Sequence, residues 1–318
     1  MATITILGGT GFVGTAMTTR LANLGHRVRV LTRDPARGRH LAVLSGVEMV
    51  RANVHDASVL SRELAGTHVA INLVGILNES GFSGQGFERA HAELTRKLVA
   101  AAADRGVARL LQMSALGADE KGPSHYQRSK GRAERFVREA PGALDWTLLR
   151  PSVIFGAGDS LLNRFAGLLR LSGGVLPLAR AGARFAPVWI GDVVVAFERA
   201  LDGGATSRQS YDLCGPEIVT LAELVRFTGE VIGVPAKVLP LPDAIARVQA
   251  FVMDFVPGRP FSTDNYRSLS VDNVCREPGF RRLGITPVSM RTIVPGYLGP
   301  DTTSARYDRF RSSAGRKA

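Results

Sequence analysis

Residues 3–14 read TITILGGTGFVG, a short apolar strand-like run that leads directly into three glycines spaced three residues apart. In a strand–turn–helix unit of this kind, the first glycine permits a tight turn, the second lets the backbone approach a pyrophosphate, and the third lets the helix pack closely. The helix start then presents backbone N–H groups to the phosphates. The position of this pattern, between a predicted strand and a predicted helix, predicts a dinucleotide-binding turn. We expect the dinucleotide to contact Gly8, Thr10, Gly11, Phe12, Val13 and Gly14.

The first half of the chain alternates strand-like and helix-like segments. Strands are predicted at 3–7, 27–31, 47–51, 69–74, 110–114 and 146–149, and helices at about 14–24, 36–44, 57–65, 87–105 and 126–139. This alternation is typical of a parallel sheet with helices on both faces. The strands are almost continuously apolar, as expected when both faces are covered. We therefore predict an α/β fold, a Rossmann-type doubly wound parallel sheet, with a smaller, mainly helical C-terminal lobe.

The domain organisation follows from this alternation. A dinucleotide-binding domain is predicted over residues 1–157, with segments at about 185–215 returning to it. Residues 158–318 form the C-terminal substrate or partner lobe, in which short strands are expected at about 186–189, 210–213 and 236–239. The last stretch, 301–318, has several arginines and little apolar mass. It is therefore predicted to be a mobile basic tail.

Composition and charge narrow the classes of partner. The net charge is +12 over 318 residues, which favours phosphates, anionic lipids or an acidic protein surface. No helix-turn-helix, zinc-finger or aromatic stacking motif accompanies this charge, so we expect no nucleic-acid partner. The two cysteines, Cys214 and Cys275, are too few for a disulfide framework and lack metal-ligand spacing, so we expect no metal site.

The hydrophobic pattern of the sequence also bears on the location of the protein in the cell. No apolar run reaches the roughly 18 residues of a transmembrane helix, and the N-terminus lacks the basic start and longer apolar stretch of a signal peptide. We expect a cytoplasmic protein, with a peripheral position at the inner face of a membrane as the alternative.

The end of the second predicted strand bears on the choice of cofactor. A site for NAD would place Asp or Glu there to accept a hydrogen bond from the ribose 2′-hydroxyl. This chain instead has Arg33, and Asp34 comes one residue later, before Pro35. A guanidinium at this position suits the 2′-phosphate of NADP, so NADP(H) is favoured over NAD(H). The alternative is that Arg33 belongs to a solvated basic helix start and Asp34 begins that helix.

Two further strand ends are predicted to line the same nucleotide. Asn53 and Val54 follow the third strand, where the adenine ring would lie, and Asn53 could hydrogen-bond its edge. Leu73, Val74 and Gly75 follow the fourth strand, where a small residue leaves room for the cofactor's ribose.

A serine, a tyrosine and a lysine form the candidate catalytic set. Ser114 ends the fifth strand, and Tyr126 and Lys130 are four residues apart, on one face of a predicted helix. A lysine ammonium close to a phenol lowers the phenol's pKa. Such a tyrosine could exchange a proton with a carbonyl or alcohol while hydride moves to or from the nicotinamide. Ser114 would then steady the substrate oxygen.

With these motifs, the chain resembles the short-chain dehydrogenase/reductase superfamily, in its extended or atypical branch. The resemblance covers about residues 1–215 and includes LRPSVIFG at 149–156, which in relatives lies along the nicotinamide end of the cofactor. It implies that Pro151 and Val153, together with Tyr126 and Lys130, contact the cofactor. The segment 187–193 is similar to the branch's later motif, where the chain rejoins the sheet.

A narrower resemblance extends to about residue 298. The motifs at 155–165, 270–274 and 283–287 are similar to those of the family of the complex I alpha-subcomplex accessory subunit nine and its bacterial relatives. That resemblance implies a tightly bound NADPH with a structural and assembly role beside the quinone region, or a link to coenzyme Q biosynthesis. It also implies a membrane-associated respiratory or quinone-biosynthesis complex as partner.

Three functions remain open at this point. The first is an NAD(P)H-binding, dehydrogenase-like protein of respiratory complex I or quinone metabolism with a partly structural nucleotide. The second is an active NADPH-dependent reductase, or a sugar-nucleotide epimerase or dehydratase, that uses Tyr126 and Lys130. The third is an NADPH-sensing regulator without turnover.

One helical segment outside these motifs has two interpretations. Residues 241–256 place apolar side chains at Ile245, Val248, Val252 and Phe255. This stripe could lie on a membrane or a partner, or it could cover the core of the C-terminal lobe. The second interpretation is favoured, because Asp243 and Asp254 would oppose an anionic surface.

Overall fold

The computed structural model describes residues 1–79, 81–256 and 261–299. The chain divides into two compact units. The first unit comprises Met1–Pro151, Gly191–Leu213 and Cys275–Thr286, and the second comprises Ser152–Ile190, Cys214–Val274 and the chain from Pro287 onward. The basic tail predicted at 301–318 lies outside the described residues.

A seven-stranded parallel sheet forms the centre of the first unit, in the order β11-β6-β5-β4-β1-β2-β3. Its strands are β1 (Thr3–Leu7), β2 (Arg27–Thr32), β3 (Val47–Arg51), β4 (Val69–Asn72), β5 (Arg109–Met113), β6 (Asp145–Pro151) and β11 (Gln209–Leu213). The strand order reverses between β1 and β4, and in such sheets ligands bind at the carboxyl ends of the strands beside the reversal. The predicted doubly wound α/β fold is confirmed.

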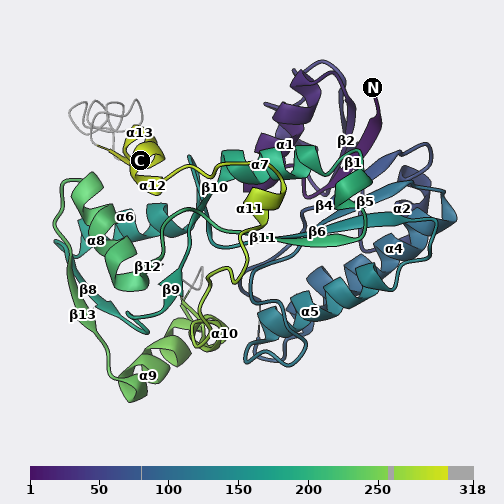
Figure 1. The fold of residues 1–318 in the computed structure, drawn as a ribbon. Helices are drawn as coiled ribbons and strands as arrows, with labels where there is room; N and C mark the ends of the chain where they lie inside the picture. The colour runs from purple at the N-terminus through teal and green to yellow at the C-terminus, as the bar shows by residue number, and fades with distance from the viewer. Residues whose placement is uncertain (80, 257–260, 300–318) are drawn as a thin grey trace. The chain divides into compact units, whose positions relative to one another are not determined.

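Helices cover both faces of this sheet (Figure 1). They are α1 (Phe12–Asn23), η1 (Pro35–Gly38), α2 (Ala57–Glu63), α3 (Gln85–Phe87), the π-helical segment η2 (Glu88–Glu93), α4 (Leu94–Asp104), α5 (His125–Arg138), α7 (Ile190–Arg199), η3 (Gly204–Thr206) and α11 (Gly279–Arg282). On one face, α2, α4 and α5 bury leucine, valine and alanine side chains against the strands. On the other face, α1 and α7 lie together, and Arg20 of α1 pairs with Glu198 of α7 at 2.8 Å.

The prediction of a helix over 36–44 is wrong for most of that segment. Only a 3₁₀ turn, η1, forms there, and turns follow it. Gly38 disfavours a helix here, because glycine is a poor helix former. A Cβ at this position would lie 2.3 Å from the methyl carbon at the flexible end of Met49. The segment therefore stays close to β3 through Gly38 and closes in short turns, such as Leu41 N–H to Gly38 O at 2.8 Å.

A buried arginine joins three elements at the far end of the sheet. Arg109 of β5 is almost fully buried. It pairs with Asp145 of β6 and donates to Thr147 at 2.6 Å and to Thr206 of η3 at 2.7 Å. Because a buried charge is costly unless it is paired, this network fixes the connection that precedes β11.

The second unit is mainly helical, as predicted. Its helices are α6 (Leu161–Leu171), α8 (Leu221–Val231), α9 (Asp243–Met253), α10 (Thr263–Ser268), α12 (Met290–Ile293) and α13 (Pro295–Leu298). Its strands pair in twos: β7 (Ile154–Phe155) with β10 (Val188–Trp189), β8 (Val175–Leu178) with β13 (Lys237–Pro240), and β9 (Arg184–Phe185) with β12 (Val219–Thr220). The core of this unit joins α6 and α8 to residues of α12 and α13.

The segment 187–193 does not rejoin the seven-stranded sheet as the resemblance implied. Its two extended residues form β10, whose register aligns Val188 with Ile154 of β7. The strand that does join the sheet is β11, which pairs in parallel with β6. The chain has only two extended residues before α7 begins at Ile190, too few to form a strand of the main sheet.

Among the described residues, none of the helices combines the length and apolarity needed to cross a bilayer. Within the same ranges, no group of three or more His, Cys, Asp or Glu side chains is arranged to hold a metal ion. Neither Cys214 nor Cys275 is a free thiol, so the cysteine content does not argue for a reducing compartment.

Candidate functional site

The glycine turn between β1 and α1 is built by steric necessity. Gly8 has a φ of +82°, a left-handed conformation that glycine adopts without strain. Gly14 has no room for a side chain, because a Cβ would lie 2.1 Å from the Gly8 carbonyl oxygen. Gly11 is the N-cap of α1, and no side chain caps this helix start. The first N–H groups of α1 are therefore presented as an anion site of the kind that binds a pyrophosphate.

The strand reversal places the end of β4 against this turn. The backbone N–H of Leu73 donates to the carbonyl of Leu7 at 2.9 Å. A Cβ on Gly8 would lie 3.0 Å from the carbonyl carbon of Leu73 and 3.1 Å from the nitrogen of Val74. The structure thus brings together the glycine turn and the 73–75 segment, two stretches that lie far apart in the sequence.

The residues expected at the adenosine end follow β2 and β3. Arg33 is exposed directly after β2, and Asp34 accepts a hydrogen bond from the N–H of Ala36 at 3.0 Å as the N-cap of η1. Asn53 is exposed, and its side-chain oxygen accepts from the N–H of His55 at 3.2 Å. Its side-chain NH₂ is the group that could donate to an adenine edge. Val54 is buried in the core beside it.

Positive charge gathers at this end. Burial lowers the pKa of His55, and the nearby Arg89, Lys97 and Arg33 lower it further. Lys97 also donates to the His55 carbonyl at 2.8 Å. Three cations and one carboxylate, Glu93, thus act on His55, and the balance of charge near the ends of β2 and β3 is positive.

Tyr126 and Lys130 share one face of α5, as their spacing predicts. The Lys130 ammonium nitrogen lies 6.0 Å from the centre of the Tyr126 ring and donates to the carbonyl of Met113 at 3.3 Å. Gly75, which follows β4, lies beside the ammonium group, because a Cβ there would be 3.3 Å from the Lys130 nitrogen. The small residue expected at 75 therefore leaves room beside the lysine.

The structure places Ser114 differently from the catalytic hypothesis. Its side chain is buried directly after β5, and its hydroxyl donates to the Glu134 carboxylate at 2.6 Å. Glu134 is itself 1% exposed and also accepts from Arg150 at 2.7 Å and Arg138 at 2.8 Å. The hydroxyl expected to steady a substrate oxygen is thus held by a buried carboxylate, which the sequence analysis did not identify.

The expected lowering of the phenol's pKa is wrong. Burial raises the pKa of Tyr126 to about 12. Burial also lowers the pKa of Lys130 to about 8, against the opposing effect of the Glu134 carboxylate. Desolvation sets the direction of both shifts, and the charge of Lys130 does not lower the pKa of Tyr126 as the four-residue spacing suggested.

His91 is the site residue that sequence reasoning missed. It belongs to η2, and its ring meets the Tyr126 ring edge-on with centroids 5.5 Å apart. Its Nε2 accepts from the N–H of Ile76 at 3.0 Å, so Nδ1 carries the proton that it shares with Ser129 at 2.8 Å. Burial, and then the Lys130 charge, hold the pKa of His91 well below its ordinary value. No spacing or neighbouring motif marks His91 in the sequence.

The last two residues of the predicted set fall in different units. Pro151 ends β6, and its carbonyl accepts from the N–H of Leu116 at 3.0 Å in the first unit. Val153 lies in the second unit, where its carbonyl accepts from the N–H of Val188 at 2.9 Å.

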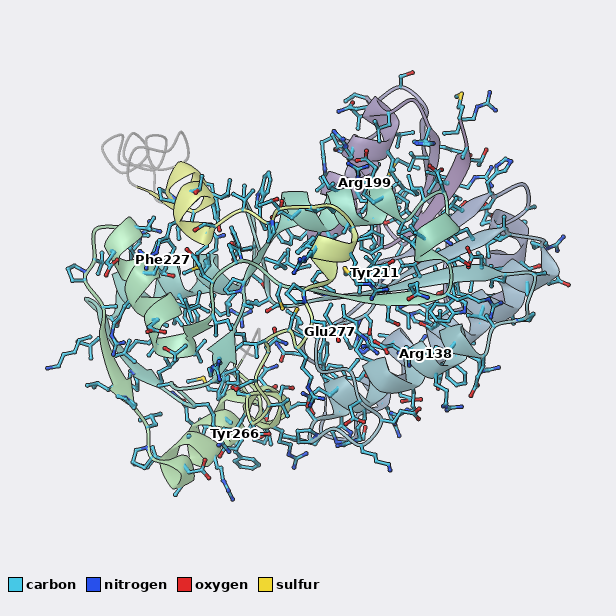
Figure 2. The ribbon with its side chains drawn as sticks, in the orientation of Figure 1. Arg138, Arg199, Tyr211, Phe227, Tyr266 and Glu277 are labelled. Carbon is cyan, nitrogen blue, oxygen red and sulfur yellow. The ribbon has the colours of Figure 1, made fainter. Side chains whose placement is uncertain are left out.

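The first unit also has a polar cavity of about 280 Å³ beside β11. Its lining includes Arg150, Asp212, Glu277 and Arg282. Figure 2 labels Glu277 and also Tyr211, which belongs to β11. Arg282 stacks over the Tyr211 ring at 4.6 Å and donates to Gln209, while Arg150 pairs with Asp212 at 3.5 Å. None of the predicted site residues lines this cavity.

Comparison with known proteins agrees with this geometry. The profile of a family described as NAD(P)H-binding matches residues 8–160. NADH dehydrogenase (ubiquinone) 1 alpha subcomplex subunit 9 of Arabidopsis thaliana is 32% identical over 284 residues, which are 85% of this chain and 68% of the relative. The chain belongs to the alpha subcomplex subunit 9 family. It is therefore an NAD(P)H-binding protein of the short-chain dehydrogenase type.

Other proteins that are similar to this chain, in sequence or in fold, have names that state enzymatic activities. A ceramide reductase of Caulobacter vibrioides is 32% identical over 249 residues, 76% of this chain and 74% of the relative. A dTDP-glucose 4,6-dehydratase of Streptomyces venezuelae, solved with NAD bound, has a TM-score of 0.74 at 21% identity and covers 99% of both chains. The first likeness is one of sequence, and the second is one of fold alone.

The lack of room for a side chain at Gly14 leads to a prediction about the stability of the fold. Gly14→Ala places a methyl group against the Gly8 backbone and should lower the free energy of unfolding by about 1–3 kcal/mol. Urea unfolding of both proteins measures this difference. Gly142→Ala is the control, because nothing lies within 4 Å of its added Cβ. An unchanged stability of Gly14→Ala would show that α1 is not packed on the turn.

The lowered pKa of Lys130 yields a prediction about pH. Its ordinary value is 10.5, so between pH 8 and 10 the unfolded chain keeps a proton that the folded chain has lost. The unfolded state then binds more protons, and stability rises with pH. The stability of the parent relative to Lys130→Met should grow by about 1–3 kcal/mol from pH 7 to pH 10.

Urea unfolding at four pH values tests this. Lys121→Met, at an exposed lysine, is the control for the loss of one positive charge. A parent-to-variant difference for Lys130→Met that is constant with pH would contradict the burial of the ammonium.

Proposed function

We propose that this chain holds NADP(H) as a largely structural nucleotide and serves respiratory complex I or quinone metabolism. The observation that carries the proposal is the hydrogen bond from Ser114 to Glu134 at 2.6 Å. A serine held in this way is not directed toward a substrate oxygen. The raised pKa of Tyr126 also works against proton transfer near neutral pH.

The assignment of the site belongs to this proposal. The pyrophosphate contacts the turn at Gly8, Gly11 and Gly14, where the start of α1 is uncapped. Within the first unit, Leu73, Val74, Gly75 and Pro151 flank the nucleotide, with Tyr126 and Lys130 at its nicotinamide end. The first unit acts as the dinucleotide-binding part, and the second unit acts as the substrate or partner part.

The preference for NADP(H) is supported by two features of the adenosine end. Asp34 caps η1 through one of its oxygens, and it lies one residue beyond Arg33, which occupies the position where an NAD site has its acidic residue. Arg33, Arg89 and Lys97 together contribute positive charge there. A 2′-phosphate carries about two negative charges that such a cluster would stabilise.

The proposed partner and location follow from the relatives. Several are named as subunits of NADH dehydrogenase or NADH-ubiquinone oxidoreductase, at 26–32% identity. We propose that this chain likewise associates with a respiratory or quinone-biosynthesis complex, as a peripheral protein at the inner face of a membrane.

An NADPH-dependent reductase is the second candidate. It is favoured by the placement of Lys130 beside Tyr126, 6.0 Å from the ring centre, and by the ceramide reductase relative. In this case Tyr126 would be the proton donor, and Ser114 would have to leave Glu134 for substrate.

Arg33→Ala should weaken NADPH binding by about 10- to 150-fold, because a charge-assisted contact of roughly 1.5–3 kcal/mol is lost. NADH binding should hardly change. Calorimetric titration of both nucleotides measures the two affinities. Arg27→Ala is the matched control, since Arg27 is exposed at the opposite end of the same strand. Equal affinities of the parent for NADPH and NADH would refute the preference.

Tyr126→Phe should retain both NADPH binding and the accompanying rise in melting temperature, because one hydroxyl is removed and the phosphate contacts remain. Gly11→Val should lose binding, since its side chain would occupy the volume of the pyrophosphate. At about 1,000-fold excess of ligand over Kd, that binding is worth about 4 kcal/mol of stability.

NADH-driven oxygen uptake in cells with matched protein levels then separates the candidates. Gly11→Val should impair respiration, whereas Tyr126→Phe should leave it largely intact. If Tyr126→Phe is folded, binds nucleotide and is as damaging as Gly11→Val, the function is proton transfer and the reductase replaces the structural role.

A further inference from the structure

Helix α9 of the second unit exposes its large apolar side chains. Four of them, Ile245, Val248, Phe251 and Val252, are each between 53% and 62% exposed. In the turn that follows the helix, Phe255 is 67% exposed and Val256 is 37% exposed. The spacings of three and four residues among the four helical side chains place those four on one side of the helix, and the other two continue from its end. We refer to these six residues as the apolar face of α9.

The opposite side of α9 attaches the helix to the protein. Ala246 and Ala250 are fully buried there and pack with Ala179 and Tyr266. The small side chains thus face inward and the large ones outward, the reverse of a helix that covers a core. The favoured interpretation of 241–256, a helix that covers the lobe with its apolar stripe, is therefore wrong.

The two carboxylates that argued against an anionic surface both have partners within the unit. Asp254 is buried, and it accepts from the N–H and hydroxyl of Thr263 at 3.2 and 2.6 Å. Asp243 pairs with Arg247 at 2.7 Å and Arg180 at 3.2 Å. Two guanidiniums around Asp243 make the start of α9 positive. The Asp254 carboxylate just after its end stays negative, because the Thr263 donors are neutral.

Size and charge decide what covers this face. A helix of 11 residues is only about 16 Å long, so its face alone falls well short of the roughly 800 Å² per partner that a stable dimer buries. An interfacial helix needs only to immerse its apolar side by about 5–10 Å in the boundary between headgroups and acyl chains. The net charge of +12 adds attraction to anionic lipids.

We propose that the apolar face of α9 is a membrane-docking surface that inserts into bilayers containing anionic lipid. The inference is independent of the nucleotide site, because it uses no residue of the first unit. It assigns to the second unit the contact with the membrane.

Co-sedimentation of the full chain with vesicles tests the proposal. The parent should bind vesicles of phosphatidylcholine with about 30% phosphatidylglycerol, and bind more weakly to phosphatidylcholine alone. The triple variant I245S/V248S/V252S should lose at least about tenfold in affinity, because it removes apolar area that is buried only on insertion. Leu171→Ser, at a side chain of α6 that is 87% exposed, should bind like the parent.

Two further measurements distinguish a loss of membrane binding from misfolding and from a change in oligomeric state. Circular dichroism should show equal folding of all three proteins, since the changed side chains are exposed. Light scattering should show the same mass for parent and triple variant.

The proposal is overturned if the parent does not bind anionic vesicles, if the triple variant binds as well as the parent, or if Leu171→Ser loses as much. A parent dimer that the triple variant converts to a monomer would also overturn it, because the face would then join two copies of this chain. In Val248→Trp, tryptophan emission should shift to the blue on adding anionic vesicles, and no shift would equally reject insertion.

Discussion

The buried carboxylate of Glu134 is the interaction on which the site of the first unit depends. It accepts hydrogen bonds from Ser114 after β5, from Arg150 on β6 and from Arg138 on its own helix. A carboxylate that is 1% exposed would be very costly without such partners. The network therefore fixes α5 against the ends of two strands. Because Lys130 precedes Glu134 by one helical turn, the position of the ammonium next to Gly75 follows from the same constraint.

Most of the fold of the first unit could be predicted from sequence, because its determinants are local. The strands have four to seven residues, and most have apolar side chains at several positions. Contacts among residues 8–14 largely determine the glycine turn. The one helix that failed, 36–44, depends on a contact that is not local. Gly38 lies next to the side chain of Met49 on β3, and no pattern within 36–44 reveals that neighbour.

The sequence could predict which residues gather at the candidate site, but it could not predict their contacts and burial. Spacing places Tyr126 and Lys130 on one helix face, and the structure agrees. Spacing does not show which side chains desolvate them, and burial decides the direction of both pKa shifts. His91 lies beside them because the π-helical turn η2 packs on α5. The bond between Ser114 and Glu134 likewise joins residues 20 positions apart through the packing of a helix on a sheet.

Helix α9 shows a different limit of sequence analysis. The periodicity of 241–256 correctly indicates an amphipathic helix, but periodicity is symmetric: it separates two sides without showing which side faces the protein. The alanines at 246 and 250 contain the missing information, since small side chains allow the close approach that packing against Ala179 and Tyr266 requires. Asp254 points the same way, because its carboxylate lies on the alanine side and accepts two hydrogen bonds from Thr263. Once that side is attached, the large apolar side chains have only the outside to face, and the charge of the chain as a whole then bears on what meets them.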